Sequence, residues 1–458
     1  MEDDLQIGEN ELGSELTGLN KGDQAKKKNI LIISAIASVF VLIVLIIIIL
    51  ISSSGKSEDE EEEPDYSKLQ KLAEINCVFD VSSNTEPTQI LGSEFVKNSV
   101  FNILIEGKSI KYSKEYLFET RGNHNVQFVM YKDFNMDNMF KDVNNLLSVN
   151  MVSDKGAKIT SMISSFENCD SLETLTIKGF DTSQVKSMHK FLYGCNGEYI
   201  DFTKIEIDTS NVEDMSYMLS NTRIENLDLK NINTANVYNI SHMFSRSFSL
   251  INLDVSKFDT SKVKDMTYLF SECEALTDLD VSSFKTNSVV KMSGMFREMI
   301  SLTKIDVSSF NTGSVEDMSE MFSDCCSLKE LNINNFITSN VKNISSMFNL
   351  CSSLKSLDVS NYDTSLVEDM SRLFSGCRSL VSLDLTNFKT SKVKDMSFMF
   401  YYNSLLQFLD ISSFDTSNVK NMASMFKDVS IITNINGIKN LNTKQVTDMS
   451  SMFLGSIY

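Results

Sequence analysis

The sequence contains no tryptophan and, among its 458 residues, only three histidines and two prolines. His124, His189 and His242 are scattered, without the partner spacing that a metal site or a nucleophile–base pair requires. This scarcity indicates a protein that is not an enzyme, holds no metal and needs no cofactor. Both prolines, Pro64 and Pro87, lie near the start, so the strongest breaker of regular structure is missing from everything after Pro87.

Basic residues are fewer than acidic residues. The chain has 42 Lys and Arg against 61 Asp and Glu, a formal net charge of −19. The only basic run is Lys26 to Lys28, beside an apolar segment. Because phosphate binding needs clustered Lys and Arg, nucleic acid is excluded as an expected partner.

Residues 30–51 form a continuous uncharged apolar run. At about 1.5 Å per residue, a helix of this length would cross the roughly 30 Å hydrocarbon core of a bilayer. A cleaved signal peptide is the alternative, although its apolar region is usually about 7–15 residues long. Lys21 and Lys26 to Lys28 precede the run and only Lys56 closely follows it. The positive-inside tendency then predicts a single-pass protein of the cell membrane, with a cytoplasmic N-terminus and an extracellular C-terminal part.

The rest of the chain divides by composition. Residues 1–29 are acidic and poor in apolar side chains, which predicts a disordered cytoplasmic tail. Residues 52–65 contain a run of like charges that predicts a solvated stalk. Residues 66–132 alternate apolar and polar positions, which favours a small β-rich domain that caps the segment after it.

Residues 133–458 repeat with a period of 26, in about twelve units. A valine marks the register, with one-residue slips at a few places. These valines are Val185, Val212, Val237, Val263, Val289, Val315, Val341, Val367, Val393, Val419 and Val446.

Each unit has two halves with different apolar spacing. The first half, as in Val393, Met396, Met399 and Phe400, has the spacing of one face of a short helix. The second half reads L-x-x-L-x-L, the alternation of a strand with inward-facing leucines. Neither half buries enough surface alone, so the units must stack. The expected fold is an α/β solenoid, a right-handed leucine-rich-repeat-like coil with one parallel strand and one short helix per unit.

Two polar positions also recur. A threonine occupies the turn between the halves in eleven consecutive units, from Thr182 to Thr443, where stacked hydroxyls could satisfy backbone amides. An aspartate follows the valine by two residues, as in Asp265 and Asp317, at the position expected for a helix N-cap.

The unit F-D-T-S-x-V-x-D-M-S-x-M-F-x-x-C-x-S-L-x-x-L-D-V-S-x resembles the repeat of BspA-like leucine-rich-repeat surface proteins. The likeness covers about 300 residues and leaves out the N-terminal segments. The resemblance implies surface display and adhesion or ligand binding, and it carries no catalytic motif to this chain.

An aspartate column is the candidate ligand-binding site. Its members hold the outward position between the last two strand leucines of each unit, so stacking should align them on the sheet face. They are either solvated or turn-bonded carboxylates of the repeat, or contacts for basic ligands. Unchanged binding after Asp306→Ala and Asp358→Ala would count against the second interpretation. The column comprises Asp228, Asp254, Asp280, Asp306, Asp358, Asp384 and Asp410.

Six of the eight cysteines share one repeat position, which Ser247 and Met299 fill elsewhere. Buried free thiols and disulfides between adjacent coils both fit this pattern. Asn239 and Asn343 begin glycosylation sequons, which matter only in a eukaryotic host. The six cysteines are Cys169, Cys195, Cys273, Cys325, Cys351 and Cys377.

The expected function is a surface-anchored solenoid that binds extracellular protein or glycan ligands, from a host or a matrix. The alternative is a structural coat protein whose repeated faces pack laterally. Exposed strand positions differ from unit to unit while core positions do not, which favours recognition over a coat.

Overall fold

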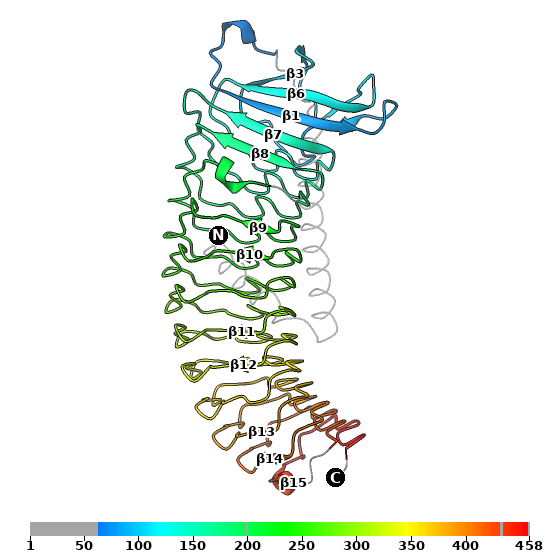
Figure 1. Cartoon of the computed structure of the whole chain (residues 1–458), viewed down its shortest axis with the longest axis vertical. Coiled ribbons are helices and arrows are strands. Elements are labelled where there is room, and N and C mark those ends of the chain that lie inside the picture. The colour runs from blue at the N-terminus through cyan, green and yellow to red at the C-terminus, as the bar shows by residue number, and fades with distance from the viewer. Residues whose placement is uncertain (1–62, 198–199, 431–433, 457–458) are drawn as a thin grey trace, which may run out of the picture. The chain divides into compact units, whose positions relative to one another are not determined.

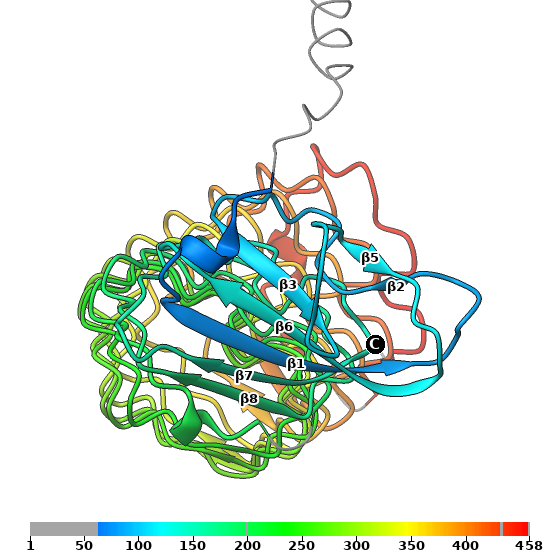
Figure 2. The same cartoon turned by 90° about the horizontal axis from the view of Figure 1, so that it is seen from above.

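The computed structural model describes residues 63–197, 200–430 and 434–456 (Figure 1). Within them, units 26 residues apart form successive coils of a β-solenoid stacked along one axis. Figure 2, a view turned by 90°, shows these coils lying over one another. The repeat solenoid predicted from the valine spacing is therefore confirmed.

Short parallel strands line one face of the solenoid, and we call this the strand face. For example, β9 (Asn226–Leu227) pairs in parallel with β10 (Asn252–Leu253), one unit later. These strands fall in the L-x-x-L-x-L segments, where the sequence places them. Further strands along this face are β11 (Lys304–Ile305), β12 (Glu330–Leu331), β13 (Ser382–Leu383), β14 (Phe408–Asp410) and β15 (Asn434–Asn436).

The predicted helix in each unit is wrong. In the described ranges there is no α-helix, and the only helical pieces are three short 3-10 turns. The segment from Met266 to Cys273 shows the reason, because Tyr268 and Glu272 have φ angles of 51° and 62°. Left-handed residues cannot continue a right-handed helix, and each costs roughly 1–2 kcal/mol for an L-residue. The fold is consequently a β-solenoid and not an α/β solenoid. The 3-10 turns are η1 (Tyr66–Lys68), η2 (Phe202–Lys204) and η3 (Ile438–Asn440).

The backbone hydrogen bonds of this segment explain why the strained residues are tolerated. Alternate amides bond within the coil, as Leu269 N does to Met266 O at 3.2 Å. The amides between them bond to the next coil, as Phe270 N does to Met295 O at 2.9 Å. A helix would use every amide internally, whereas this run of turns joins each coil to its neighbour.

Aspartate or asparagine forms three turns in a typical coil. Asp254, Asp259 and Asp265 each accept, through Oδ1, a hydrogen bond from the backbone amide two residues later, at 2.9–3.1 Å. Such side-chain turns replace a backbone bond at a corner. Asp265 forms an isolated parallel β-bridge with Lys291 and begins a turn, so it does not cap a helix as predicted.

The repeat threonines cross-link neighbouring coils. The hydroxyl of Thr312, which is fully buried, donates to the carbonyl oxygen of Ile337 at 2.9 Å. The hydroxyl oxygen of Thr312 in turn accepts from the Ile337 amide at 2.7 Å. One hydroxyl thus satisfies both polar groups of a residue in the next coil, a pattern that Thr286 and Thr364 repeat.

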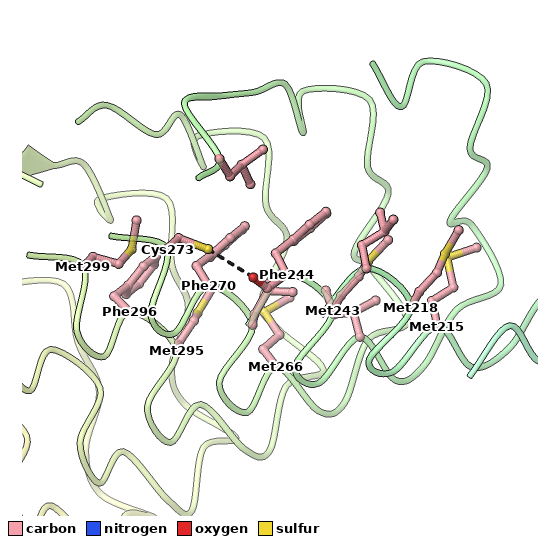
Figure 3. Packing of buried hydrophobic residues seen from close by; sticks show 14 of the residues in the cluster. Met215, Met218, Met243, Phe244, Met266, Phe270, Cys273, Met295, Phe296 and Met299 are labelled. Carbon is pink, nitrogen blue, oxygen red and sulfur yellow. Dashed lines mark hydrogen bonds between the residues drawn. The ribbon is translucent and has the colours of Figure 1, made fainter. Parts of the chain in front are cut away.

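Stacked phenylalanine rings fill the interior of the solenoid. Phe322 lies 5.5 Å from Phe296 and 6.0 Å from Phe348, measured between ring centroids, and all three rings are nearly parallel. Phe244, Phe270 and Phe296 begin the same stack beside buried methionines (Figure 3). The apolar 3-and-4 spacing of the sequence therefore marks core positions correctly, although the backbone is not helical.

All eight cysteines are free thiols, which decides between the two interpretations of the cysteine column. The thiol of Cys273 donates to the carbonyl oxygen of Phe244 in the preceding coil, at 3.1 Å (Figure 3). Ser247 and Asn403 use their side chains in the same way. The position thus accommodates a small donor, and burial raises the pKa of the Cys273 thiol to about 12, so it stays protonated.

A mixed sheet covers the first coil. Its strand order is β4-β3-β6-β1-β7-β8, in which β1 pairs antiparallel with β7 and β7 pairs in parallel with β8. The strand edge of β7 is therefore hydrogen-bonded by the segment that precedes the repeats (Figure 1). A separate pair, β2 with β5, lies outside this sheet. The bounds are β1 (Ala73–Val81), β2 (Thr88–Gln89), β3 (Phe101–Ile105), β4 (Lys108–Ile110), β5 (Glu115–Tyr116), β6 (Gly122–Met130), β7 (Leu146–Val152) and β8 (Thr174–Lys178).

The predicted membrane localisation is corrected. Across the part of the chain that the structure describes, no helix has both the length and the apolar character needed to cross a bilayer. The predicted tail 1–29, the membrane helix 30–51 and the stalk up to residue 62 lie outside the described residues. A single-pass membrane protein is therefore not supported by the residues that the structure describes, and the bilayer contact of residues 30–51 stays a prediction.

Candidate functional site

The strand face presents its variable side chains to solvent. The position before the strand leucine is exposed in the eight coils from Asn226 to Phe408 and changes from amide to acid, base and aromatic ring. The leucine beside it hardly changes, because it packs into the core. Variation is therefore confined to the side that a ligand can reach. The variable residues are Asn226, Asn252, Asp278, Lys304, Glu330, Ser356, Ser382 and Phe408.

The predicted aspartate column lies on the same face. Asp228, Asp254, Asp280, Asp306, Asp358 and Asp384 are exposed and Asp410 is half-buried, in successive or near-successive coils.

Each carboxylate of the column is fixed by a turn. Oδ1 of Asp358 accepts from the amide of Ser360 at 3.0 Å and from its hydroxyl at 2.7 Å. Asp384 bonds to Thr386 in the same way. These hydrogen bonds hold the pKa of Asp358 and of Asp384 below the usual range, because they favour the charged form. The column thus consists of oriented anions at neutral pH.

Three of the seven predicted aspartates gather in one groove, and the other four lie further along the face. The groove is a hollow of about 750 Å³ that runs across the coils from η2 to Asp280. Six carboxylates line it, together with Ile251, whose side chain is 49% exposed. Two cations pair with these carboxylates, Lys230 with Asp228 at 2.9 Å and Lys204 with Asp201 at 3.7 Å. We call this hollow the acidic groove. Its carboxylates belong to Asp201, Glu225, Asp228, Asp254, Asp278 and Asp280.

Asp201, Glu225 and Ile251 were not predicted as site residues. Asp201 caps η2 by accepting from the amide of Thr203 at 3.0 Å, which aims it along the strand face. Glu225 and Ile251 hold the same repeat position, next to the variable residue. A comparison of that second outward position between coils would have identified them.

The strand face changes character beyond the acidic groove. Exposed Lys304, Lys329 and Lys355 follow it along the axis. Val381 and Phe408, which are 40% and 49% exposed, lie beyond them. Beyond the acidic groove, a ligand that extends along this face would therefore meet lysine and then apolar side chains beside the remaining aspartates of the column.

The described residues form no cluster suited to a metal ion, and the two predicted glycosylation sequons lie in turns. No group of three or more His, Cys, Asp or Glu side chains is arranged to hold a metal ion in the ranges described. The half-buried side chains of Asn239 and Asn343 use Oδ1 to accept from the amides of Ser241 and Ser345. Glycosylation of Asn239 and Asn343 stays a prediction.

Acid should destabilise the fold in two steps. Burial lowers the pKa of His189 and of His242, because the folded state favours their neutral forms. Their contribution to stability is fully present above about pH 6.5 and is lost as the pH falls below that value. The turn aspartates, such as Asp254, have a pKa lowered by hydrogen bonds, so their contribution is complete above about pH 4 and is lost below it. We expect thermal melts followed by circular dichroism to show a small fall in midpoint from pH 7 to 5 and a larger one below pH 4. A midpoint that rises on acidification would contradict this assignment.

Comparison with known proteins supports the repeat and leaves its activity open. Four overlapping stretches, residues 134–250, 200–302, 246–357 and 343–457, match one family. No curated protein matches the chain. The matched family does not carry the BspA-like name, so that finer resemblance stays a prediction. Because the matches together span most of the chain, this protein belongs to the family described as "Mycoplasma protein of unknown function, DUF285".

Proposed function

We propose that this chain is a recognition protein, not an enzyme, and that its acidic groove binds a basic segment of a protein partner. The observation that carries the proposal is the gathering of six carboxylates around one exposed isoleucine, Ile251, in the same hollow. Lys and Arg side chains would pair with the carboxylates, while their methylene stems would cover Ile251.

The state of the carboxylates supports binding over proton transfer. The pKa of Asp254 and of Asp280 is held low by hydrogen bonds from Ser256 and Ser282, respectively. A general acid or base works best with a pKa near the operating pH, and these groups are moved in the opposite direction. Fixed anions suit the recognition of cations, since the turns have already limited their freedom before the partner arrives.

A protein suits this groove better than a glycan. The aromatic residue that lines it, Phe202, is 4% exposed and offers no open ring for a sugar to stack on. The differences between coils also argue against lateral packing into a coat, which would favour identical repeated contacts.

The test removes charge without removing the turns. Asparagine holds the aspartate position of the strand face at Asn332, where Oδ1 still accepts from the Asn334 amide at 3.2 Å. The groove variant therefore combines Glu225→Gln, Asp254→Asn and Asp278→Asn. Alanine at Asp306 or Asp358 would be less informative, because it removes the turn acceptor and lies outside the groove.

The control variant combines Asp306→Asn, Asp358→Asn and Asp384→Asn. It changes the net charge of the chain by the same amount as the groove variant, but at residues outside the groove. Binding of a fluorescent lysine- and arginine-rich peptide to the full chain would be followed by anisotropy. We expect the groove variant to bind about tenfold more weakly, from three partly exposed ion pairs, and the control to change by less than about twofold. Equal losses in both variants would mean general attraction by net charge and would overturn the proposal.

A further inference from the structure

A second hollow, of about 520 Å³, lies on a different side of the coil and shares no residue with the acidic groove. It is lined mainly by the residues that directly precede and directly follow the repeat valines of adjacent coils. We call it the tyrosine hollow. Its lining residues are Lys186, Asn211, Glu213, Asn236, Tyr238, Ser261, Lys262, Lys264 and Ser288.

The residues that directly follow the repeat valines form a column along the solenoid, and this column runs through the hollow. Several of its members form ion pairs. At the position after the valine, Lys and Glu of adjacent coils pair with each other. Glu316 pairs with Lys342 at 2.7 Å, and Glu368 pairs with Lys394. Lys186 pairs with Glu213 at 2.9 Å. Within each of these three pairs of adjacent coils, the charge in the column is therefore balanced.

The pattern is broken in the two coils after Glu213. Tyr238 and Lys264 occupy the column there, followed by Val290. Tyr238 is 45% exposed, although large aromatic rings are usually buried in this fold. Lys264 has no carboxylate partner among the described side chains, and Lys262 donates to the amide oxygen of Asn236 at 2.5 Å. The hollow thus combines an open phenol ring with a local excess of positive charge.

Hydrogen bonds between coils hold the backbone that carries these side chains. Tyr238 N donates to Glu213 O at 2.9 Å, and Lys264 N donates to Tyr238 O at 2.8 Å. Asn211 and Asn236 are held by bonds to carbonyl oxygens of the preceding coil, at 3.0 and 2.7 Å. A ligand would therefore meet two oriented side-chain amides beside a ring and ammonium groups whose backbone positions are fixed.

We propose that the tyrosine hollow binds a carboxylated sugar, such as a uronic acid unit of an acidic polysaccharide. The Tyr238 ring would cover an apolar face of the sugar, Lys264 and Lys262 would pair with its carboxylate, and Asn and Ser side chains would bond to its hydroxyls. A phosphate ligand suits the hollow less well, because its lining has no arginine and the amides of Tyr238 and Lys264 are already bonded.

The test uses the full chain and isothermal titration calorimetry. The probe is a hexasaccharide of alternating glucuronic acid and N-acetylglucosamine, and the neutral comparison is a hexamer of N-acetylglucosamine. We expect saturable binding of the acidic probe only, and competition by excess glucuronate. Equal binding of the two oligosaccharides, no binding of either, or no competition by glucuronate would overturn the proposal.

Point variants assign the binding to this hollow. Lys264→Gln removes the unpaired ammonium, and Tyr238→Val introduces the residue that Val290 already supplies at this position. Each should weaken binding of the acidic probe about tenfold, while Lys342→Gln, in a paired coil of the same column, should leave it unchanged. The acidic-groove variant should also leave it unchanged, which separates this site from the proposed function. An unchanged affinity in Lys264→Gln would place the sugar elsewhere.

Discussion

Replacement of Phe322 by alanine should lower the free energy of unfolding by about 3–5 kcal/mol, the usual cost of emptying a buried aromatic site. Phe322 is fully buried, and its ring lies between those of Phe296 and Phe348. The loss should be large here because rigid coils on both sides can collapse into the gap only by breaking their own hydrogen bonds. Urea unfolding of the full chain, followed by circular dichroism, measures the change.

The matched control is Phe322→Leu. Leu192 and Leu219 already fill the equivalent position in two earlier coils, where both are fully buried. A leucine should therefore cost about 1–2 kcal/mol, since it keeps most of the buried apolar volume. Similar losses for alanine and leucine would show that ring stacking, and not volume, holds these coils together, and would contradict the cavity argument.

Replacement of Thr312 by valine should cost about 2–4 kcal/mol, although the two side chains have nearly the same shape. The hydroxyl of Thr312 is bonded to both the amide and the carbonyl of Ile337. Valine would leave these two partly buried groups of the next coil without the hydroxyl, and an unsatisfied buried polar group costs roughly 1–3 kcal/mol. Native-state hydrogen exchange should show faster exchange at the Ile337 amide than at amides several coils away.

Thr312→Ser is the control for this substitution. Serine keeps the hydroxyl and removes one methyl group, so it should cost about 1 kcal/mol and leave the Ile337 amide protected. If valine were tolerated as well as serine, the threonine column would be a packing feature only, and the cross-linking role assigned to its hydroxyls would be wrong.

Much of the core could be predicted from the sequence, since the valine, methionine and phenylalanine positions are buried in the coils from Val185 to Phe426; in the last unit Val446 is half-buried and Met449 and Phe453 are exposed. The helix was predicted wrongly because apolar residues spaced three and four apart fit both a helix and a run of turns. The signal for turns was present at two repeat positions: Gly294 stands where the preceding coil has left-handed Tyr268, and Gly376 stands where the preceding coil has left-handed Leu350. Glycine tolerates a positive φ without strain, so its recurrence there marks the break.

The aspartate column was predicted as a line of equivalent residues, but only part of it contributes to the acidic groove. Asp254 and Asp306 form the same turn, and in both the hydrogen bonds from the serine two residues later lower the pKa of the carboxyl. They differ in their surroundings, since Asp254 has Glu225, Ile251 and Asp278 beside it and Asp306 follows Lys304. Repetition alone could not distinguish them.

The amino-acid sequence by itself determined the period, the parallel stacking of units and the identity of the buried positions, because these follow from which side chains avoid water. Only the tertiary structure decided the backbone path of each coil and the places where charge collects. The physical reason is that the decisive partners are not local. An amide that could close a helix finds a carbonyl in the next coil, and a carboxylate becomes part of the acidic groove only through neighbours one unit away.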